Sequence, residues 1–194
     1  TNKKNISPTP VIGGVGLISN LKKPMNHRLK KDNSIVIVIG KTFGHLEQSA
    51  FLEEVYSITD GQPPEINLKN EKNNGEAVLE IIKKDLVNSV HDISSGGLIV
   101  ALAEMSIGSN FGLKIYKPKK LTKLIKYLFG EDQGRYILEI DKEKLKKVEE
   151  ILKNNNIFYE QIGLTQKDFF EIEDEFKIDI KKLYKINNQW YNNF

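Results

Sequence analysis

The sequence predicts an α+β domain, and two patterns carry most of that prediction. Ser34 to Gly40 (SIVIVIG) contains five consecutive β-branched residues, which is typical of a strand buried on both faces. Lys142 to Asn154 places apolar residues at helical spacing between charged ones, as in a helix that covers a sheet. Strand and helix patterns alternate without an internal repeat, so we expect one layered α/β or α+β domain.

The chain before the first strand is expected to be mostly extended. Residues 1–10 are polar and contain two prolines. Val11 to Ile18 (VIGGVGLI) mixes apolar residues with glycines, which predicts a strand or tight turn whose backbone packs closely against another element. After the strand at 34–40, Leu46 to Ser57 predicts a short helix that ends before the turn at residues 60–64 (DGQPP).

The remaining elements follow from local periodicity and from turn residues. The helix that starts at Leu98 is almost wholly apolar, so we expect it to be buried on nearly every side. The helix that precedes Gly130 should stop at that glycine. The predicted helices cover residues 75–86, 98–107, 121–128, 142–154 and 178–186, and the predicted strands cover 87–90, 111–116, 135–140 and 157–162. The tail carries Phe169 to Phe176 before the last predicted helix.

Composition limits the classes of function. The chain has 194 residues, of which 39% are hydrophobic and 28% charged, as expected of one globular domain with a proper core. It has no cysteine, which excludes disulfides, zinc–thiolate sites and cysteine nucleophiles. No apolar run is long enough for a bilayer and no secretory signal is visible, so we expect a cytoplasmic protein without a membrane partner. The net charge of +3 is weak, and the basic run Lys114 to Lys126 reads as a solvated helix face, so no nucleic-acid partner is expected.

The segment most informative about function is His91 to Leu98 (HDISSGGL), which leads into the apolar helix. Its serines are good N-cap residues, and a helix that opens this way presents free N–H groups to an anion. Gly96 and Gly97 would let a ligand approach the backbone, Ser94 would donate to a phosphate oxygen, and Asp92 offers a hard oxygen ligand for Mg²⁺. This predicts a phosphate–magnesium corner. The alternative is an ordinary capped helix in which Asp92 only favours the dipole.

Two other glycine patterns do not predict phosphate sites. Gly40-Lys41-Thr42 resembles the end of a P-loop, but the required glycine five residues earlier is Ile35, so no nest of N–H groups is expected. The glycines at 13, 14 and 16 do not make a dinucleotide-binding fingerprint.

The three histidines, His27, His45 and His91, lack the spacing of a zinc site. His91 could act in proton transfer beside Asp92, but a structural role that holds the loop is the favoured interpretation. His45 is expected to be a neighbour of a helix cap.

Three ordered segments resemble one known family. These are Thr9 to Gly16 (TPVIGGVG), His91 to Leu98 and Leu128 to Arg135 (LFGEDQGR). They are similar to the C-terminal end of phosphoribosylformylglycinamidine synthase, the large synthetase subunit of purine biosynthesis. Residues 42–49 (TFGHLEQS) and 60–64 resemble the alphaproteobacterial branch of that family, so the resemblance covers nearly the whole chain.

The resemblance implies a position within a longer chain. The family shares its architecture with aminoimidazole ribonucleotide synthetase, and its small form has two pseudo-symmetric A–B halves. Residues 1–20 would then be a lead-in or the end of an A domain. Residues 21–194 would be the second B domain, a layered α/β/α domain with a mixed sheet like the C-terminal domain of that synthetase. Implied partners are the missing A and B domains, a glutaminase subunit and a small accessory subunit.

The resemblance also implies a reaction and a site. The family converts formylglycinamide ribonucleotide (FGAR) to its amidine with ATP and glutamine-derived ammonia. Most residues that bind the reactants lie in the absent domains, so no catalytic residue is assigned here and the chain alone should be inactive. In large-form relatives, the positions of Asp92 and Ser94 touch the magnesium and nucleotide of an auxiliary ATP site. Ser95 replaces a usual second Asp, and the triplet at 131–133 is Glu-Asp-Gln where many members have Glu-Ser-Gln.

Two alternatives stay open at this stage. The chain could be a stand-alone module of the wider ATP-binding synthetase and kinase superfamily, although the A domain that holds reactive phosphates there is missing. It could also be a structural interaction domain whose motif is only a capped helix.

Overall fold

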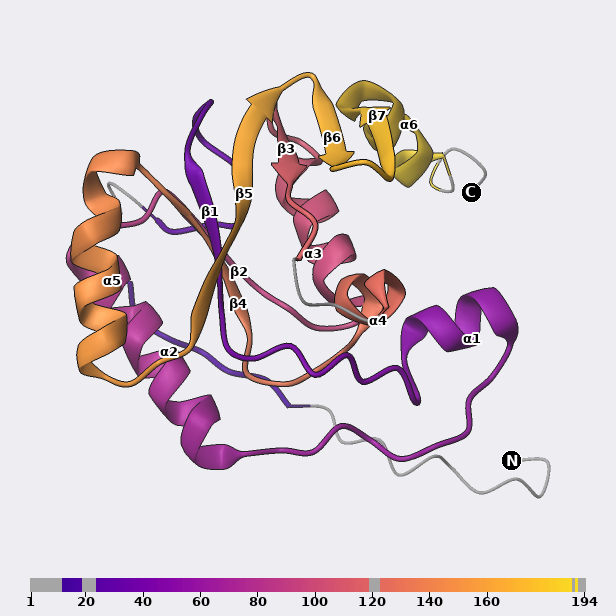
Figure 1. Cartoon of the computed structure of the whole chain (residues 1–194), viewed down its shortest axis with the longest axis horizontal. Coiled ribbons are helices and arrows are strands. Elements are labelled where there is room, and N and C mark those ends of the chain that lie inside the picture. The colour runs from indigo at the N-terminus through magenta and orange to yellow at the C-terminus, as the bar shows by residue number, and fades with distance from the viewer. Residues whose placement is uncertain (1–11, 19–23, 119–122, 190, 192–194) are drawn as a thin grey trace.

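The computed structural model describes residues 12–18, 24–118, 123–189 and 191, and these residues contain a seven-stranded sheet (Figure 1). The strand order is β2-β4-β1-β5-β3-β6-β7, and the sheet is mixed because β3 and β6 pair in parallel while the other pairs are antiparallel. The α+β prediction is therefore confirmed. The strands are β1 (Ile35–Ile39), β2 (Ser89–Asp92), β3 (Phe111–Ile115), β4 (Tyr136–Ile140), β5 (Tyr159–Lys167), β6 (Phe169–Ile172) and β7 (Phe176–Asp179).

Helices pack on both faces of this sheet. On one face α2 and α5 cover the sheet, and on the other face α3 and α4 do so (Figure 1). The longest described helix, α2, has 16 residues, and none of the described helices is long and apolar enough to cross a membrane. The helices are α1 (Ala50–Tyr56), α2 (Leu68–Lys83), α3 (Gly97–Ser106), α4 (Leu124–Phe129), α5 (Leu145–Asn154) and α6 (Ile180–Asn188), with a 3-10 turn at Lys142–Lys144.

Strand β1 lies at the centre of both cores, as its sequence predicts. All five of its residues are buried, between β4 and β5. Because successive side chains of a strand point to opposite faces, Ile37 packs with α2 and α5 whereas Val36 and Val38 pack with α3 and α4. The β-branched run therefore reflects burial on two faces.

The helix after the motif is less buried than its composition predicts. Leu98, Leu102 and Met105 of α3 are fully buried against the sheet. Val100, however, is 36% exposed, and Glu104 lies on the same open side. The prediction of burial on nearly every side is therefore wrong, because no described element covers the second face of α3.

Two element boundaries differ from the predicted ones. Helix α2 begins at Leu68 and not at residue 75, because Asn67 caps it by accepting the N–H of Asn70. Its first two turns are polar and give no periodic signal. Strand β2 runs from Ser89 to Asp92 and so includes the first residues of the motif, since its register is set by pairing with β4.

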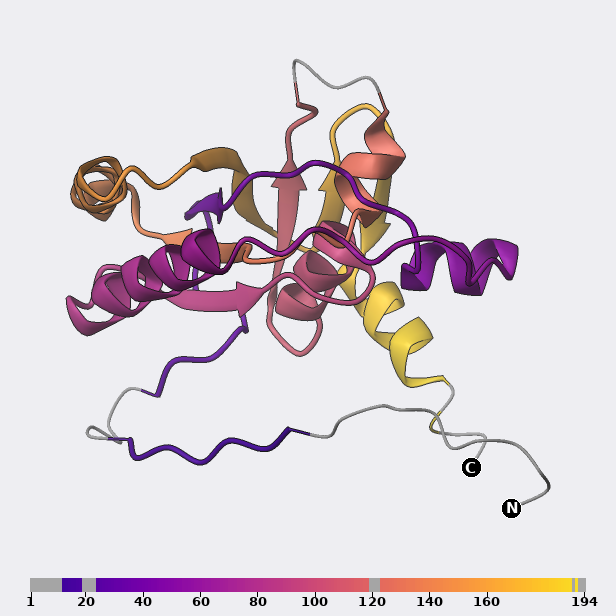
Figure 2. The same cartoon turned by 90° about the horizontal axis from the view of Figure 1, so that it is seen from below.

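Residues 12–18 form no strand in this chain, contrary to the prediction. Ile12 is 90% exposed, and Val15 and Leu17 are fully exposed. No atom would lie within 4 Å of a Cβ built on their glycines, and the segment runs apart from the sheet (Figure 2). The close packing that the glycines predict therefore has no partner among the described residues. Residues 1–11 lie outside the described residues.

Asp141, just beyond β4, forms hydrogen bonds with two other segments of the chain. The stability of the fold is therefore expected to decrease at acid pH. Its carboxylate accepts hydrogen bonds from Lys31 Nζ at 2.8 Å and Asn88 Nδ2 at 2.7 Å. Burial acts to raise the pKa of Asp141, but these two hydrogen bonds outweigh it, so the pKa is lowered. A lowered folded-state pKa stabilises the fold above the unfolded value of about 4, and this stabilisation is lost as pH falls below it.

We therefore expect Asp141→Asn to lower the free energy of unfolding by about 1 kcal/mol at pH 7. The difference from the unsubstituted chain should shrink as the pH falls from about 5 to about 2. Urea unfolding at several pH values measures it, with the exposed Asp60→Asn as control. A difference that does not depend on pH would mean that the charge of Asp141 is unimportant.

Candidate functional site

The predicted corner lies where β2 passes into α3. Asp92 ends β2 opposite Tyr136 of β4, and its side chain is 64% exposed. One of its oxygens lies 3.2 Å from His91 Nδ1. Ser94 follows in the turn and is also exposed. The fold thus leaves both predicted ligand side chains open to solvent at the mouth of α3.

The side chain that accepts a backbone N–H group at the N-terminus of α3 comes from a distant segment, which the sequence did not indicate. The N-cap residue is Gly96, which has a φ of +82° and makes no side-chain cap, so the prediction that the serines cap this helix is wrong. Instead, Glu131 Oε1 accepts the N–H of Gly96 at 2.7 Å and that of Ala50, the first residue of α1, at 2.8 Å. One carboxylate therefore stabilises the N-terminal ends of two helices, where negative charge is favoured.

The glycines of the motif have structural reasons that need no ligand. Gly97 has a φ of +71°, and a Cβ on it would lie 2.7 Å from the carbonyl oxygen of Gly130. A Cβ on Gly96 would meet the side chain of Val100. Close packing against the end of α4 thus accounts for Gly97. Contact of Gly96 and Gly97 with a phosphate stays a prediction.

A second carboxylate fills a nest of backbone N–H groups after β1. Asp132 Oδ2 accepts the N–H groups of Phe43 and Gly44 at 2.9 Å, and Oδ1 accepts that of His45 at 3.2 Å. Three consecutive donors of this kind form an anion-binding concavity. The sequence around Gly40-Lys41-Thr42 predicts no such nest. The structure has one, and Asp132, which is only 5% exposed, occupies it.

Arg135 holds the same turn together from inside. Its side chain is fully buried and donates to the carbonyl oxygens of Asp132 at 3.0 Å and Gly130 at 2.6 Å, and to Thr42 Oγ1 at 3.2 Å. Burial lowers the pKa of Arg135, and the charge of Asp132 opposes that effect. Glu131, Asp132 and Arg135 thus anchor the loops around the corner. The only sequence signal for this was a dense run of charges directly before a buried strand.

Two of the histidines, His27 and His91, form a small polar cluster beside the corner. His91 Nε2 lies 3.0 Å from Glu104 Oε2 of α3, and the His91 ring centroid is 5.0 Å from that of His27. Burial, followed by the charge of His91, lowers the pKa of His27. Both ring nitrogens of His91 are hydrogen-bonded to carboxylates, which supports a structural role for this side chain. His45 Nε2 lies 2.9 Å from the carbonyl oxygen of Gln62, so this side chain holds a loop.

The oxygen ligands at the corner suit a Mg²⁺ ion that is bound to a nucleotide better than one held by protein groups alone. No group of three or more His, Asp or Glu side chains arranged to hold a metal occurs among the described residues. Asp92 is the one carboxylate that the motif offers, since Ser95 supplies none. Mg²⁺ retains several waters and commonly combines one or two carboxylates with phosphate oxygens. Asp92 meets that requirement only if a phosphate is present.

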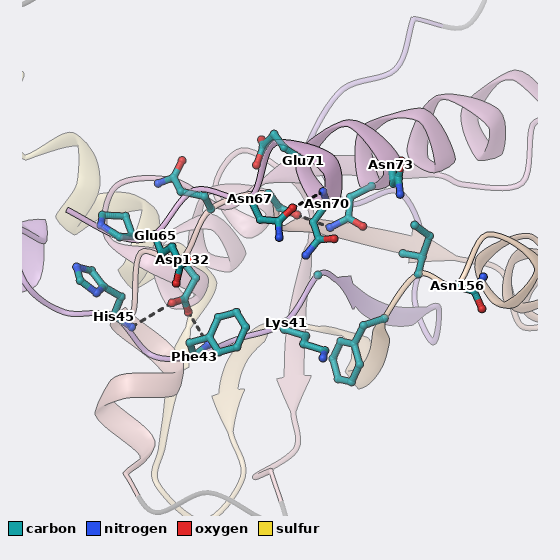
Figure 3. A pocket seen from close by; sticks show the side chains of 17 residues that line it. Lys41, Phe43, His45, Glu65, Asn67, Asn70, Glu71, Asn73, Asp132 and Asn156 are labelled. Carbon is teal, nitrogen blue, oxygen red and sulfur yellow. Dashed lines mark hydrogen bonds between the residues drawn. The ribbon is translucent and has the colours of Figure 1, made fainter. Parts of the chain in front are cut away.

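A separate cavity of about 550 Å³ is bordered by the turn that contains Asp132 (Figure 3). None of the motif residues 91–98 lines it. Its walls come from the loop after β1, the N-terminal turns of α2, the turn before β4 and the loop before β5. No local sequence pattern indicates this cavity, because its lining is assembled from four separate segments. The lining residues are Gly40, Lys41, Phe43, His45, Pro64, Glu65, Asn67, Asn70, Glu71, Asn73, Asn74, Asp132, Gln133, Gly134, Asn156, Ile157 and Phe158.

Comparison with known proteins identifies the family. Residues 31–173 match the family described as AIR synthase related protein, C-terminal domain. The chain belongs to this family. The matched range runs from just before β1 to the end of β6, so it includes the corner, the turn at 130–135 and most of both cores. The family resemblance that the three sequence segments carried is thereby confirmed.

Members of the AIR synthase related family that resemble this chain are several times longer. The phosphoribosylformylglycinamidine synthase subunit PurL of Pelagibacter ubique (strain HTCC1062) is 44% identical over 194 residues, which are all of this chain and 27% of that protein. The chain thus spans about a quarter of the length of this curated relative.

Solved structures of Thermotoga maritima PurL share the fold. The form complexed with FGAR has a TM-score of 0.66 at 16% identity, covering 82% of this chain and 29% of that one. The form complexed with ATP has a TM-score of 0.63 at 15% identity, covering 82% and 27%. A structure of PurLQS from the same organism has a TM-score of 0.61 at 18% identity, covering 82% and 27%. The α/β/α layers with a mixed sheet are therefore those of PurL.

Proposed function

We propose that this chain is the second B domain of an ATP-dependent carbon–nitrogen ligase. The whole ligase would convert FGAR, ATP and glutamine-derived ammonia to formylglycinamidine ribonucleotide. The observation that carries the proposal is the 44% identity to PurL of P. ubique along the full length of this chain. The PurL structures complexed with FGAR and with ATP support the substrate and the nucleotide. Residues 21–194 would be the domain, with residues 1–20 as the end of the preceding A domain.

The described residues support a domain that acts only with the rest of its chain. The carboxylates of Glu131, Asp132 and Glu139 accept hydrogen bonds within the domain, from backbone N–H groups in each case. They hold loops and are not free for acid–base chemistry. We propose that the catalytic residues of the ligase lie in its other domains, so the isolated chain would be inactive.

Helix α1 is a surface on which the missing domains would dock. It has no buried residue and projects from the body of the molecule (Figure 1). Phe51 contacts Phe129 with a centroid distance of 4.4 Å, but Val55 is 60% and Tyr56 57% exposed on the same helix. Exposed apolar groups of this kind mark protein interfaces. The A and B domains that precede this one would cover them. By analogy with PurLQS, a glutaminase subunit and a small accessory subunit would complete the cytoplasmic assembly.

Amidine formation tests this function directly. A chain extended at its N-terminus to the length of the relatives should convert FGAR, ATP and ammonia to the amidine, and the 194-residue chain should not. Product detection by mass spectrometry measures both. Turnover by the 194-residue chain alone would support a stand-alone enzyme of the wider superfamily. Inactivity of the extended chain with the other two subunits present would contradict the ligase assignment.

The corner at the mouth of α3 is proposed as an auxiliary MgATP site. Asp92 would ligate the nucleotide-bound Mg²⁺, Ser94 would donate to a phosphate oxygen, and Gly96 and Gly97 would lie against the phosphates. The exposure of Asp92 and Ser94 supports this arrangement. Because Glu131 already accepts the N–H of Gly96, few backbone donors remain for the ligand. Affinity in the 194-residue chain should therefore be weak, on the order of millimolar.

The substitution Asp92→Asn tests whether the corner is an auxiliary MgATP site or only the capped end of a helix. We expect the extended chain to bind MgATP more tightly than the 194-residue chain, and Asp92→Asn to weaken that binding roughly tenfold, or about 1.4 kcal/mol. The metal would lose its one charged ligand from this segment. Titration calorimetry with MgATP measures the effect, with Asp60→Asn as a control at an exposed carboxylate. Equal affinities would leave the motif with a structural role.

A further inference from the structure

The cavity beside the turn at 132–134 has the dimensions of a small-molecule site. Its volume of about 550 Å³ lies within the range of roughly 300–1,000 Å³ that such sites occupy. One wall comes from the N-terminal turns of α2 and another from the turn that leads into β4. Asn74 Nδ2 joins these walls by donating to the carbonyl oxygen of Gly134 at 2.8 Å. The cavity is thus part of the folded domain.

Side-chain amides dominate the polar lining. Asn67 Oδ1 is committed to capping α2, as the hydrogen bond to the N–H of Asn70 shows. The amide of Asn70 itself makes no hydrogen bond to any described residue, and it lies at the centre of the cavity above Phe43 and Lys41 (Figure 3). An amide offers a donor pair and an acceptor side by side. Asn70 can therefore pair with a neutral group that presents one donor and one acceptor.

The charges of the lining disfavour an anion. Asp132 already fills the nest of N–H groups at 43–45, which would otherwise be the natural seat for a phosphate. Glu65 and Glu71 add two further carboxylates to the lining, and Lys41 is its one lysine. The formal charge of these side chains is therefore negative. An uncharged ligand avoids the repulsion that a phosphate would meet.

Two phenylalanine side chains line the cavity and are accessible to solvent. Phe43 is 80% exposed and Phe158 is 47% exposed. Lys41 Nζ lies 6.0 Å from the centroid of the Phe158 ring. Exposed phenyl rings beside amides provide stacking surfaces for a planar ligand.

We propose that this cavity binds an uncharged aromatic heterocycle of the nucleobase type. The ring would stack on Phe158 or Phe43, and Asn70 would pair with its hydrogen-bonding edge. The site is distinct from the proposed MgATP corner, because no residue of 91–98 lines the cavity. It selects against phosphate, whereas the corner requires it.

Binding of three probes to the 194-residue chain tests the proposal. Adenosine should bind with a dissociation constant in the millimolar range or tighter. Adenosine 5′-monophosphate should bind no more tightly than adenosine, and glucose should not bind. Saturation-transfer NMR detects binding and titration of the Asn70 side-chain amide resonances locates it. The proposal would be overturned if adenosine did not bind at a concentration of roughly 10 mM, which corresponds to a very weak affinity. It would also be overturned if the monophosphate bound tenfold more tightly than adenosine, or if glucose bound as tightly as adenosine.

Matched variants then assign the residues. Phe158→Ala and Asn70→Leu should each weaken adenosine binding on the order of tenfold, as expected for a lost stacking surface or a lost base-edge contact. Tyr184→Ala and Asn187→Leu change similar exposed residues on α6 and should have no effect. Asp92→Asn should also leave adenosine binding unchanged, so failure of the MgATP corner is distinguishable from failure here. Unchanged binding in folded Phe158→Ala and Asn70→Leu would overturn the proposal.

Discussion

Asp132→Ala is expected to lower the free energy of unfolding by about 3–5 kcal/mol, because it removes one partner from a buried charged cluster. The carboxylate is only 5% exposed and accepts three consecutive N–H groups of the loop after β1. Arg135 NH1 lies 3.9 Å from the same carboxylate, and that guanidinium has no exposed surface. Without Asp132, the three N–H groups would lose their acceptor and the buried guanidinium would lose its neighbouring negative charge.

Urea unfolding at neutral pH measures this loss. Asp60→Ala, at an exposed carboxylate, should change stability by no more than about 0.5 kcal/mol. The double variant Asp132→Ala with Arg135→Met should lose less than the sum of the single losses, since neither charge is then left alone. A loss below about 1 kcal/mol for Asp132→Ala would show that water replaces the carboxylate in the nest.

Gly97→Ala is expected to destabilise the domain by about 3 kcal/mol or more. The left-handed conformation at φ +71° costs an alanine roughly 1–2 kcal/mol. The new Cβ would also lie 2.7 Å from both the carbonyl oxygen of Gly130 and the carbonyl carbon of Phe129. These are backbone atoms, so α3 and the end of α4 must separate to admit the methyl group.

Gly75→Ala provides the matched control for this substitution. Gly75 lies inside α2 with ordinary helical geometry, and the nearest atom to a new Cβ is Tyr136 Oη at 3.6 Å. Alanine there should raise stability by about 0.5–1 kcal/mol. Thermal unfolding compares the two. If Gly97→Ala kept full stability but lost MgATP affinity, the glycine would serve the ligand and not the packing.

Several features of the fold follow from local residue patterns. The β-branched run at 35–39 requires apolar surroundings on both faces, and a central strand is the element that provides them. The apolar positions of α5 place Val148, Ile151 and Leu152 on the sheet, which the spacing predicts directly. These properties depend on neighbours in sequence, so they can be predicted without knowledge of the rest of the chain.

The arrangement around the corner could not be predicted in the same way. The serines before α3 are good cap residues by local rules, yet Glu131, 35 residues away from Gly96, provides the acceptor. Asp132 lies 89 residues from Phe43 and still fills the nest after β1. Local propensity favours many acceptors for a helix N-terminus, and only the approach of β4 to β2 and β1 decides which one is present.

The sequence by itself thus determined the fold class, the central strand, the family and the position of the HDISSGGL motif at a strand-to-helix junction. The tertiary structure alone decided which groups satisfy the backbone donors there, why Gly97 has no side chain, and where a cavity opens. The physical reason is how far apart along the chain the interacting residues lie. Hydrophobic periodicity is encoded within one element, whereas a filled nest, a close backbone approach and a cavity lined by four segments exist only after distant elements have packed together.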